Sequence, residues 1–231
     1  MQPQFTTGQI RPIDCVKEGF RLIKQDYWLL FAITIIGAFI AGFSLYVLAG
    51  PMVCGMMLAY FRVFDGSRAD FDDLWKGFDY FGKSIPVVIA VVLPIVIYIV
   101  AAFITLYLPI VLMAVSGGKI SPDEILPAFF IGIIVDVVIA LIMVTIHSFL
   151  IFAFPLVADR GLSGWEAMKL SARATLKNMA GVAGLIAVNI ALSIAGYLAF
   201  CVGVYLVIPI LMATNLAAYR QVFPRSAPAL S

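Results

Sequence analysis

Charged residues are scarce in this sequence. Only 12% of its 231 residues are Asp, Glu, Lys or Arg, whereas 63% are hydrophobic. A soluble domain has about 25% charged and about 45–50% apolar residues. So few charged side chains cannot cover the apolar surface that such a chain would expose to water. The composition excludes an ordinary soluble protein and predicts a chain that crosses a membrane several times.

Histidine, cysteine and net charge are also low, and each low value excludes a class of function. One histidine and three cysteines, with no C-x-x-C pair, give neither a disulfide framework nor a Cys/His metal motif. A net charge of +2 is too small to indicate a nucleic-acid partner. No phosphate-binding loop, H-E-x-x-H or G-x-S-x-G motif occurs. We therefore expect no enzyme activity, no catalytic residue, no metal and no cofactor.

Four aspartates lie close together, at positions 65, 70, 72 and 73, and raise the question of a metal site. The segment lacks the glycine and the bidentate glutamate of an EF-hand calcium loop. A helix that starts near Asp70, with Asp72 and Asp73 in its first turn, explains the carboxylates more simply.

Apolar runs with few charges indicate where the chain crosses the bilayer, because a span needs about 20 apolar residues. The 38 residues from Tyr27 to Phe64 suit two short spans with a turn near Gly42–Ser44, and the 43 residues from Gly181 to Phe223 suit a second hairpin that turns near 200–203. Residues 85–157 predict a central helix pair. The predicted fold is an all-α polytopic membrane bundle of six transmembrane helices with cytoplasmic amphipathic helices.

The positions of Lys and Arg predict the orientation of this bundle. Six spans place all but one of the 15 Lys and Arg residues on one side of the membrane, and Lys119 alone on the other. Cytoplasmic loops of membrane proteins are rich in Lys and Arg, so both termini are predicted to be cytoplasmic. The residues on the cytoplasmic side are Arg11, Lys17, Arg21, Lys24, Arg62, Arg68, Lys76, Lys83, Arg160, Lys169, Arg173, Lys177, Arg220 and Arg225.

The chain is predicted to be a single membrane domain, 1–231, with an internal repeat. Residues 11–64 and 163–223 each predict an amphipathic helix followed by a hairpin. Pro51 through Phe61-Arg62 matches Pro209 through Tyr219-Arg220 at a fixed offset of 158 residues. Because both hairpins enter from the cytoplasm, the repeat would be parallel. The alternative is that proline and a terminal arginine recur by chance.

The two basic stretches that precede the hairpins predict helices lying at the membrane interface. In the first, apolar residues recur at spacings of 3 and 4, at Ile13, Val16, Phe20, Ile23 and Tyr27. The second begins at a capping box, Ser163 with Glu166. The cations beside both stripes are candidate contacts for anionic phospholipids, although they also suit a flank that only sets topology. They are Lys17, Arg21, Lys24, Lys169, Arg173 and Lys177.

Two ionisable residues, Asp136 and His147, lie well inside a predicted span. Eleven residues of helix leave them about 20° apart on one face and about 16 Å apart along the axis. Intramembrane ionisable residues often mark proton or cation pathways. The alternative is that a neutral Asp136 makes an interhelical hydrogen bond. The candidate partners on other spans are Asn189, Ser193, Asn215, Thr105 and Tyr46.

Alanine recurs every four residues along the fifth predicted span. Small residues at this spacing let two helix backbones approach closely. We expect this face to pack against another helix of the chain or against a second copy in a homo-oligomer. Its residues are Ala183, Ala187, Ala191, Ala195 and Ala199.

Short motifs occur in both halves of the sequence. They are Gly50-Pro51 with Gly55, Arg62, Asp70–Phe78, Gly161–Ala167, Ser171, Lys177-Asn178, Pro209 and Tyr219. These motifs resemble those of a broad bacterial group of uncharacterised multi-pass membrane proteins, which is related to the membrane domain attached to some glycerophosphodiester phosphodiesterases. The resemblance implies a six-helix protein of the bacterial inner membrane, and it implies no chemistry because that domain is not the phosphodiesterase.

These features predict a non-enzymatic integral membrane protein with a structural, envelope or lipid-interacting role. Its expected partner is the lipid bilayer, above all anionic phospholipid. The alternative is a small transporter or permease with an intramembrane relay at Asp136 and His147.

Overall fold

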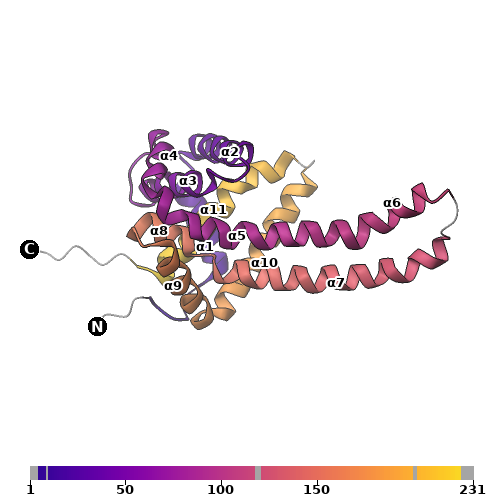
Figure 1. Ribbon diagram of the computed structural model, residues 1–231. Coiled ribbons are helices and arrows are strands. Elements are labelled where there is room, and N and C mark those ends of the chain that lie inside the picture. The colour runs from indigo at the N-terminus through magenta and orange to yellow at the C-terminus, as the bar shows by residue number, and fades with distance from the viewer. Residues whose placement is uncertain (1–4, 9, 118–120, 200–201, 225–231) are drawn as a thin grey trace, which may run out of the picture. The chain divides into compact units, whose positions relative to one another are not determined.

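The computed structural model describes residues 5–8, 10–117, 121–199 and 202–224, and every regular element in this part of the chain is a helix (Figure 1). The all-α prediction is confirmed. The elements are α1 Pro12–Ile23, α2 Tyr27–Phe43, α3 Ala49–Phe64, α4 Asp72–Lys76, the 3₁₀ helix η1 Gly77–Tyr80, α5 Phe81–Ala102, the π-helical turn η2 Phe103–Tyr107, α6 Leu108–Val115, α7 Pro122–Phe149, α8 Ala153–Arg160, α9 Gly164–Lys177, α10 Met179–Leu198 and α11 Val202–Val222.

The chain forms two compact units. Residues 1–88 and 149–231 make the larger unit, which we call the base. Residues 89–148 make the smaller one, which we call the hairpin. The turn expected near Gly42–Ser44 is confirmed, because α2 ends at Phe43. Phe200 and Cys201, where the second turn was predicted, lie outside the described residues, as do Lys119 and Arg225.

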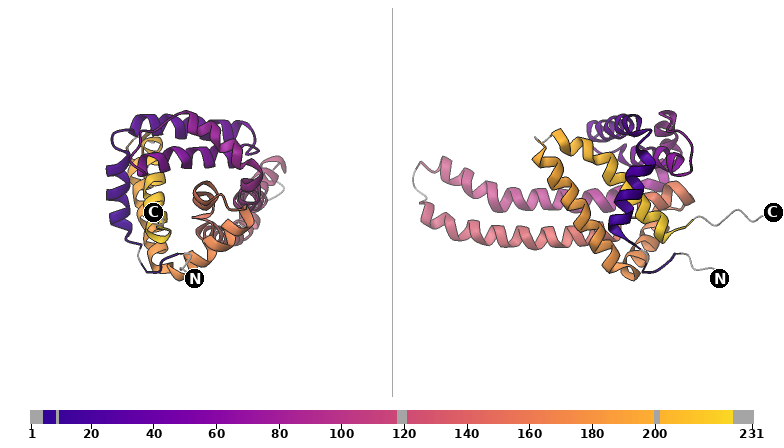
Figure 2. Two further views of the ribbon diagram at one scale, coloured as in Figure 1. Left: turned by 90° about the vertical axis from the view of Figure 1, so that its left-hand side faces the viewer. Right: turned by 180° about the vertical axis from the view of Figure 1, so that it is seen from behind.

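Within the base, α1 packs along α11, and Figure 2 shows the two helices side by side. Gly19 makes this approach close, since a Cβ atom there would lie 2.8 Å from the backbone of Ala213. Cys15, Gly19 and Ile23 are the buried residues of α1. Ile13 and Phe20, by contrast, are 63% and 44% exposed. The prediction that Ile23 shares an outward apolar stripe with Ile13 and Phe20 is therefore wrong.

The base also holds α3 against α4 and η1 at backbone contact. A Cβ atom on Gly77 would lie 1.9 Å from the Pro51 carbonyl oxygen, and one on Gly55 would lie 2.1 Å from the Leu74 carbonyl oxygen. No side chain can enter either space, so glycine is required at both positions. These contacts fix the segment that carries Asp73 beside the C-terminal end of α3.

The hairpin consists of α5 from residue 89 onward, η2 and α6 on one side and α7 up to residue 148 on the other, and the two sides run alongside each other (Figure 1). Gly132 on α7 lies against η2, where a Cβ atom would be 2.8 Å from the carbonyl oxygen of Thr105. The outer surface is apolar, with Ile134 64% and Leu141 63% exposed. Such a surface is stable in lipid and not in water.

Within the described residues, four helical stretches are long and apolar enough to cross a membrane, and they indicate a membrane-embedded protein. A fifth is added if α1 and α2, which meet at a 101° bend, form one broken span. The predicted six spans are not reached because α2 and α3 have only 17 and 16 residues, fewer than the roughly 20 that a span needs. The four stretches are Asp72–Val115, Ile125–Arg160, Met179–Leu198 and Gly203–Val222.

Candidate functional site

The C-terminal ends of α3 and α11 meet in a cluster of ion pairs centred on Arg220. Its guanidinium lies 3.2 Å from the Asp159 carboxylate of α8 and 3.5 Å from that of Asp65. It also stacks over the Phe61 ring, 4.5 Å from the centroid. The Tyr219 hydroxyl donates to Asp159 at 2.7 Å. Arg220 therefore joins three helices, and its side chain is only 17% exposed.

A second cluster surrounds Arg62, the last basic residue of α3. Arg62 contacts Asp70 and Asp73, each at 2.9 Å, and Lys76 also binds Asp73, at 2.6 Å. Asp73 is 5% exposed and lies between two cations. The backbone N–H of Asp72, together with Arg62, holds the pKa of Asp70 below its usual value. The aspartates thus hold α4 against α3. The prediction that they mark a helix start is confirmed for Asp72 and Asp73, which lie in the first turn of α4. It is wrong for Asp70 as the N-cap, because Phe71 holds that position, although Asp70 Oδ1 accepts the Asp72 N–H at 3.1 Å.

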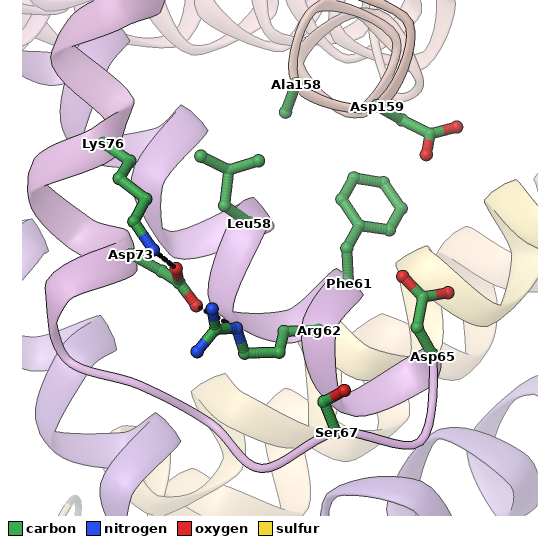
Figure 3. Close-up of a pocket in the computed structure, with 9 residues that line it drawn as sticks. All are labelled: Leu58, Phe61, Arg62, Asp65, Ser67, Asp73, Lys76, Ala158 and Asp159. Atoms are coloured by element: carbon green, nitrogen blue, oxygen red, sulfur yellow. Dashed lines mark hydrogen bonds and ion pairs between the residues drawn. The ribbon is translucent and has the colours of Figure 1, made fainter.

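A pocket of about 380 Å³ opens between these two clusters (Figure 3). Arg62, Asp73 and Lys76 stand on one side of it, and Asp65 and Asp159 on the other. Sequence reasoning singled out the Phe61-Arg62 and Tyr219-Arg220 motifs but not this pocket, because Asp159 is distant in the sequence from Arg62, Asp65 and Asp73. The remaining lining residues are Leu58, Phe61, Ser67 and Ala158.

The outer face of α9 is cationic with an aromatic anchor. Trp165 is 64% exposed, and Lys169 and Arg173 are exposed beside it. Ser171, on the opposite face, donates to the Phe149 carbonyl at 2.6 Å and accepts the Phe152 N–H at 3.1 Å. These buried bonds turn the basic residues outward.

The predicted capping box at the start of α9 is confirmed. Ser163 accepts the N–H of Glu166, and the Glu166 carboxylate accepts the Ser163 hydroxyl at 2.7 Å. The Ser163 hydroxyl holds the pKa of Glu166 below its usual value. The cap fixes where α9 begins and therefore which of its residues face outward.

The outer face of α1 repeats the pattern of α9. Ile13, Lys17 and Arg21 are exposed, at the same spacing as Trp165, Lys169 and Arg173. On both helices the residue two positions after each of these is buried: Cys15, Gly19 and Ile23 on α1, and Ala167, Ser171 and Thr175 on α9. Lys24 and Lys177, the remaining lipid-contact candidates, are exposed at the ends of their helices.

Asp136 lies inside the hairpin and is 6% exposed. Its Oδ2 atom is 2.8 Å from the Thr105 hydroxyl, and its Oδ1 atom has no hydrogen-bond partner. The Thr105 hydroxyl is also 2.8 Å from the carbonyl oxygen of Ala101. Among the predicted partners of Asp136, Thr105 is the one that the structure brings to it.

The other predicted intramembrane polar residues make separate contacts. The ring nitrogens of His147 lie 2.8 Å from the Met143 carbonyl oxygen and 3.1 Å from that of Val91. Asn189 of α10 donates to the side-chain oxygen of Asn215 of α11 at 2.8 Å. His147 thus joins the two sides of the hairpin, whereas the asparagine pair joins two helices of the base.

The alanine face of α10 points outward. Ala183, Ala187, Ala191 and Ala195 are all exposed, so the structure does not place this face against another helix of the chain. Among the described residues, no group of three or more His, Cys, Asp and Glu side chains has the arrangement of a metal site.

Comparison with known proteins found no matching protein-family model, no matching curated protein and no matching solved structure. The resemblance to the membrane domain attached to some glycerophosphodiester phosphodiesterases stays a prediction from short motifs.

Proposed function

We propose that this chain is a non-enzymatic protein of the bacterial inner membrane that binds anionic phospholipid headgroups through α1 and α9. The observation that carries the proposal is the shared outward pattern of the two helices. Each exposes an apolar residue, a lysine and an arginine at successive turns, and each buries the residue two positions after each of these.

This pattern suits the boundary between acyl chains and headgroups. Ile13 and Trp165 supply apolar surface for the acyl boundary, and the long side chains of Lys17, Lys169 and their arginine neighbours reach toward phosphate. Each Lys or Arg near an anionic leaflet contributes about 1 kcal/mol of attraction. The cations of two helices therefore suffice for preferential binding of anionic lipid.

The proposal includes the six-span topology with both termini in the cytoplasm. The α2 and α3 helices are about 25 Å long at 1.5 Å per residue, and a bilayer that thins locally accommodates such helices at modest cost. The tight turn between Phe43 and Ala49 supports a pair of spans, α2 and α3, that returns to the side from which it entered. With six spans, the faces of α1 and α9 lie on the cytoplasmic side.

Native mass spectrometry of the protein released from nanodiscs tests the lipid contact. The nanodiscs contain phosphatidylglycerol and phosphatidylcholine in equal amounts. The variants K17Q/R21Q and K169Q/R173Q each remove two cations from one face, and R68Q/K83Q removes two exposed cations elsewhere in the base. We expect each of the first two variants to retain about half as much phosphatidylglycerol as the unmodified protein, and the control to retain it all. Equal retention by all four proteins would contradict the proposal.

A second function, a small transporter, is favoured by one observation, the unpartnered Oδ1 atom of the buried Asp136. His147 contacts backbone carbonyls instead of this carboxyl group, so the carboxyl group itself would have to carry the transported proton or cation. Vesicles loaded with a pH-sensitive dye measure the flux. Loss of a proton or cation flux in D136N supports transport, and a flux equal to that of the unmodified protein excludes a role for Asp136.

A further inference from the structure

The hydrogen bonds around Thr105 determine which group carries a proton in the hairpin. The Thr105 hydroxyl has one hydrogen atom but lies 2.8 Å from two oxygen atoms, the Ala101 carbonyl and Asp136 Oδ2. A carbonyl oxygen can only accept. Thr105 can share its hydrogen atom between the two oxygens, but each contact is a full two-centre hydrogen bond only if Thr105 donates to Ala101 and accepts a hydrogen atom from Asp136.

An ionised Asp136 would fit these surroundings badly. Its Oδ2 atom would compete with Ala101 for the single Thr105 hydrogen atom, and its Oδ1 atom would have no donor. A carboxylate buried without donors or a cation is strongly disfavoured. A neutral carboxylic acid leaves only an uncharged carbonyl oxygen unpaired.

The described residues of the hairpin, 89–117 and 121–148, contain no Lys or Arg that would stabilise the ionised form, and Lys119 lies outside them. Residues 85–115, on the facing side, contain no Asp, Glu, His, Lys or Arg, and their titratable groups are Tyr98 and Tyr107. On α7 itself, the titratable residues are Asp123 and Glu124, 13 and 12 positions before Asp136, and His147, 11 positions after it. At 1.5 Å per residue, each of these is at least about 16 Å away.

We propose that Asp136 is a proton-binding site, a neutral carboxylic acid that donates to the Thr105 hydroxyl. Thr105 in turn donates to the Ala101 carbonyl.

The local backbone explains why this arrangement forms here. Thr105 lies in the π-helical turn η2, an irregularity that often occurs at functional sites. Gly132, one turn before Asp136 on α7, lets the two backbones come together, because a Cβ atom there would be 3.1 Å from the Thr105 Cβ. The proton site is therefore built into the backbone of the hairpin, and it does not depend on lipid binding by α1 and α9.

Infrared spectroscopy of the full-length protein in nanodiscs at neutral pH tests this proposal. A protonated carboxylic acid shows a C=O stretching band that carboxylates lack. We expect one such band in the unmodified protein and its absence in D136N. In T105V the band should shift to higher frequency, because the acid loses its acceptor. T145V is the matched control. Thr145 is on α7, like Asp136, and its hydroxyl donates to the Leu141 carbonyl of its own helix.

The outcomes separate cleanly. A band that T105V shifts and T145V leaves in place supports a protonated Asp136 bonded to Thr105. No band at neutral pH, or a band unchanged in T105V, overturns the proposal. If D136N fails to fold, the comparison of T105V with T145V still tests whether a protonated Asp136 donates to Thr105. Loss of the band on addition of sodium ions to the unmodified protein would instead identify a sodium site and would also overturn it.

Discussion

The base and the hairpin bury polar groups in opposite ways. In the base, Arg220 and Arg62 are each held by two carboxylates, and the ion pairs tie separate helices together. In the hairpin, the buried acid Asp136 meets a hydroxyl and no cation. The free-energy cost of removing charges from water is small for ion pairs near water, whereas a lone acid in lipid is stable only when neutral. The difference indicates that the two units are solvated differently.

Helix length separates the two units as well. The α7 helix has 28 residues and is about 42 Å long, whereas α10 and α11 have 20 and 21 residues and are about 30 Å long. A bilayer core is about 30 Å thick. The α10 and α11 helices match this thickness, whereas α7 must tilt in the membrane or extend beyond the core.

The largest expected effect comes from the backbone contacts of the base. G77V places a side chain where Gly77 meets Pro51 and Gly55, and no flexible group can move aside. We expect a loss above the ~3 kcal/mol that overpacking usually costs, so that little folded protein is recovered. G82A is the control, because a Cβ atom there meets nothing within 4 Å. Thermal unfolding in detergent measures both variants, and equal stability would show that the contact is not formed.

The next effect concerns the ion pairs of the base. R220A leaves Asp159 and Asp65 without their cation and should lower the free energy of unfolding by about 3 kcal/mol. R68A removes an arginine that is 73% exposed and contacts Asp26, and should cost at most ~1 kcal/mol. Chemical denaturation gives both values. Similar losses for the two variants would mean that the Arg220 cluster is not a structural centre.

Membrane insertion of the hairpin should change by a similar or smaller amount. Val138 is 51% exposed on the outer surface of α7. V138K should disfavour insertion by about 2.5–3.5 kcal/mol, because lysine near a span centre is costly. D136N, two residues away, removes no apolar contact with lipid and should insert normally. A glycosylation-based insertion assay measures both, and efficient insertion of V138K would argue that water surrounds this surface.

The smallest effect is the pH dependence of the α9 cap. The depressed pKa of Glu166 means that its ionised form stabilises the folded state above the ordinary pKa of glutamate, about 4.3. This contribution is lost as the pH falls through the lower folded-state pKa. E166Q should therefore melt at a slightly lower temperature than the unmodified protein at pH 7, and this difference should shrink as the pH is lowered below about 4. A melting difference that does not change with pH would contradict the assigned role.

Much of the fold could be predicted from the sequence, because its signals are local. Apolar runs locate the helices, the Ser163–Glu166 spacing locates the start of α9, and the turn after Phe43 follows from the length of the first apolar block. Asp136 stood out because an acid inside an apolar run is expensive.

What could not be predicted depends on contacts between distant segments. Asp159 meets Arg220 only because α8 and α11 are brought together by the fold. The outward face of α1 was misjudged because protein interior and lipid both favour apolar residues, so the periodicity alone does not tell which of them Ile23 meets. The decisive residue was Gly19, whose missing side chain admits α11.

Spin-label accessibility tests most directly whether the two units differ in their surroundings. Single labels are placed at Leu141 on the hairpin, at Lys17 and Lys169 on α1 and α9, and at Asp72 on α4, in a variant with alanine at the three cysteines. We expect oxygen to relax the label at 141 most strongly and a water-soluble nickel chelate to relax that at 72 most strongly. The labels at 17 and 169 should respond to both, as at the headgroup level. A label at 141 that the nickel chelate reaches, or labels at 17 and 169 that behave like that at 72, would contradict the account.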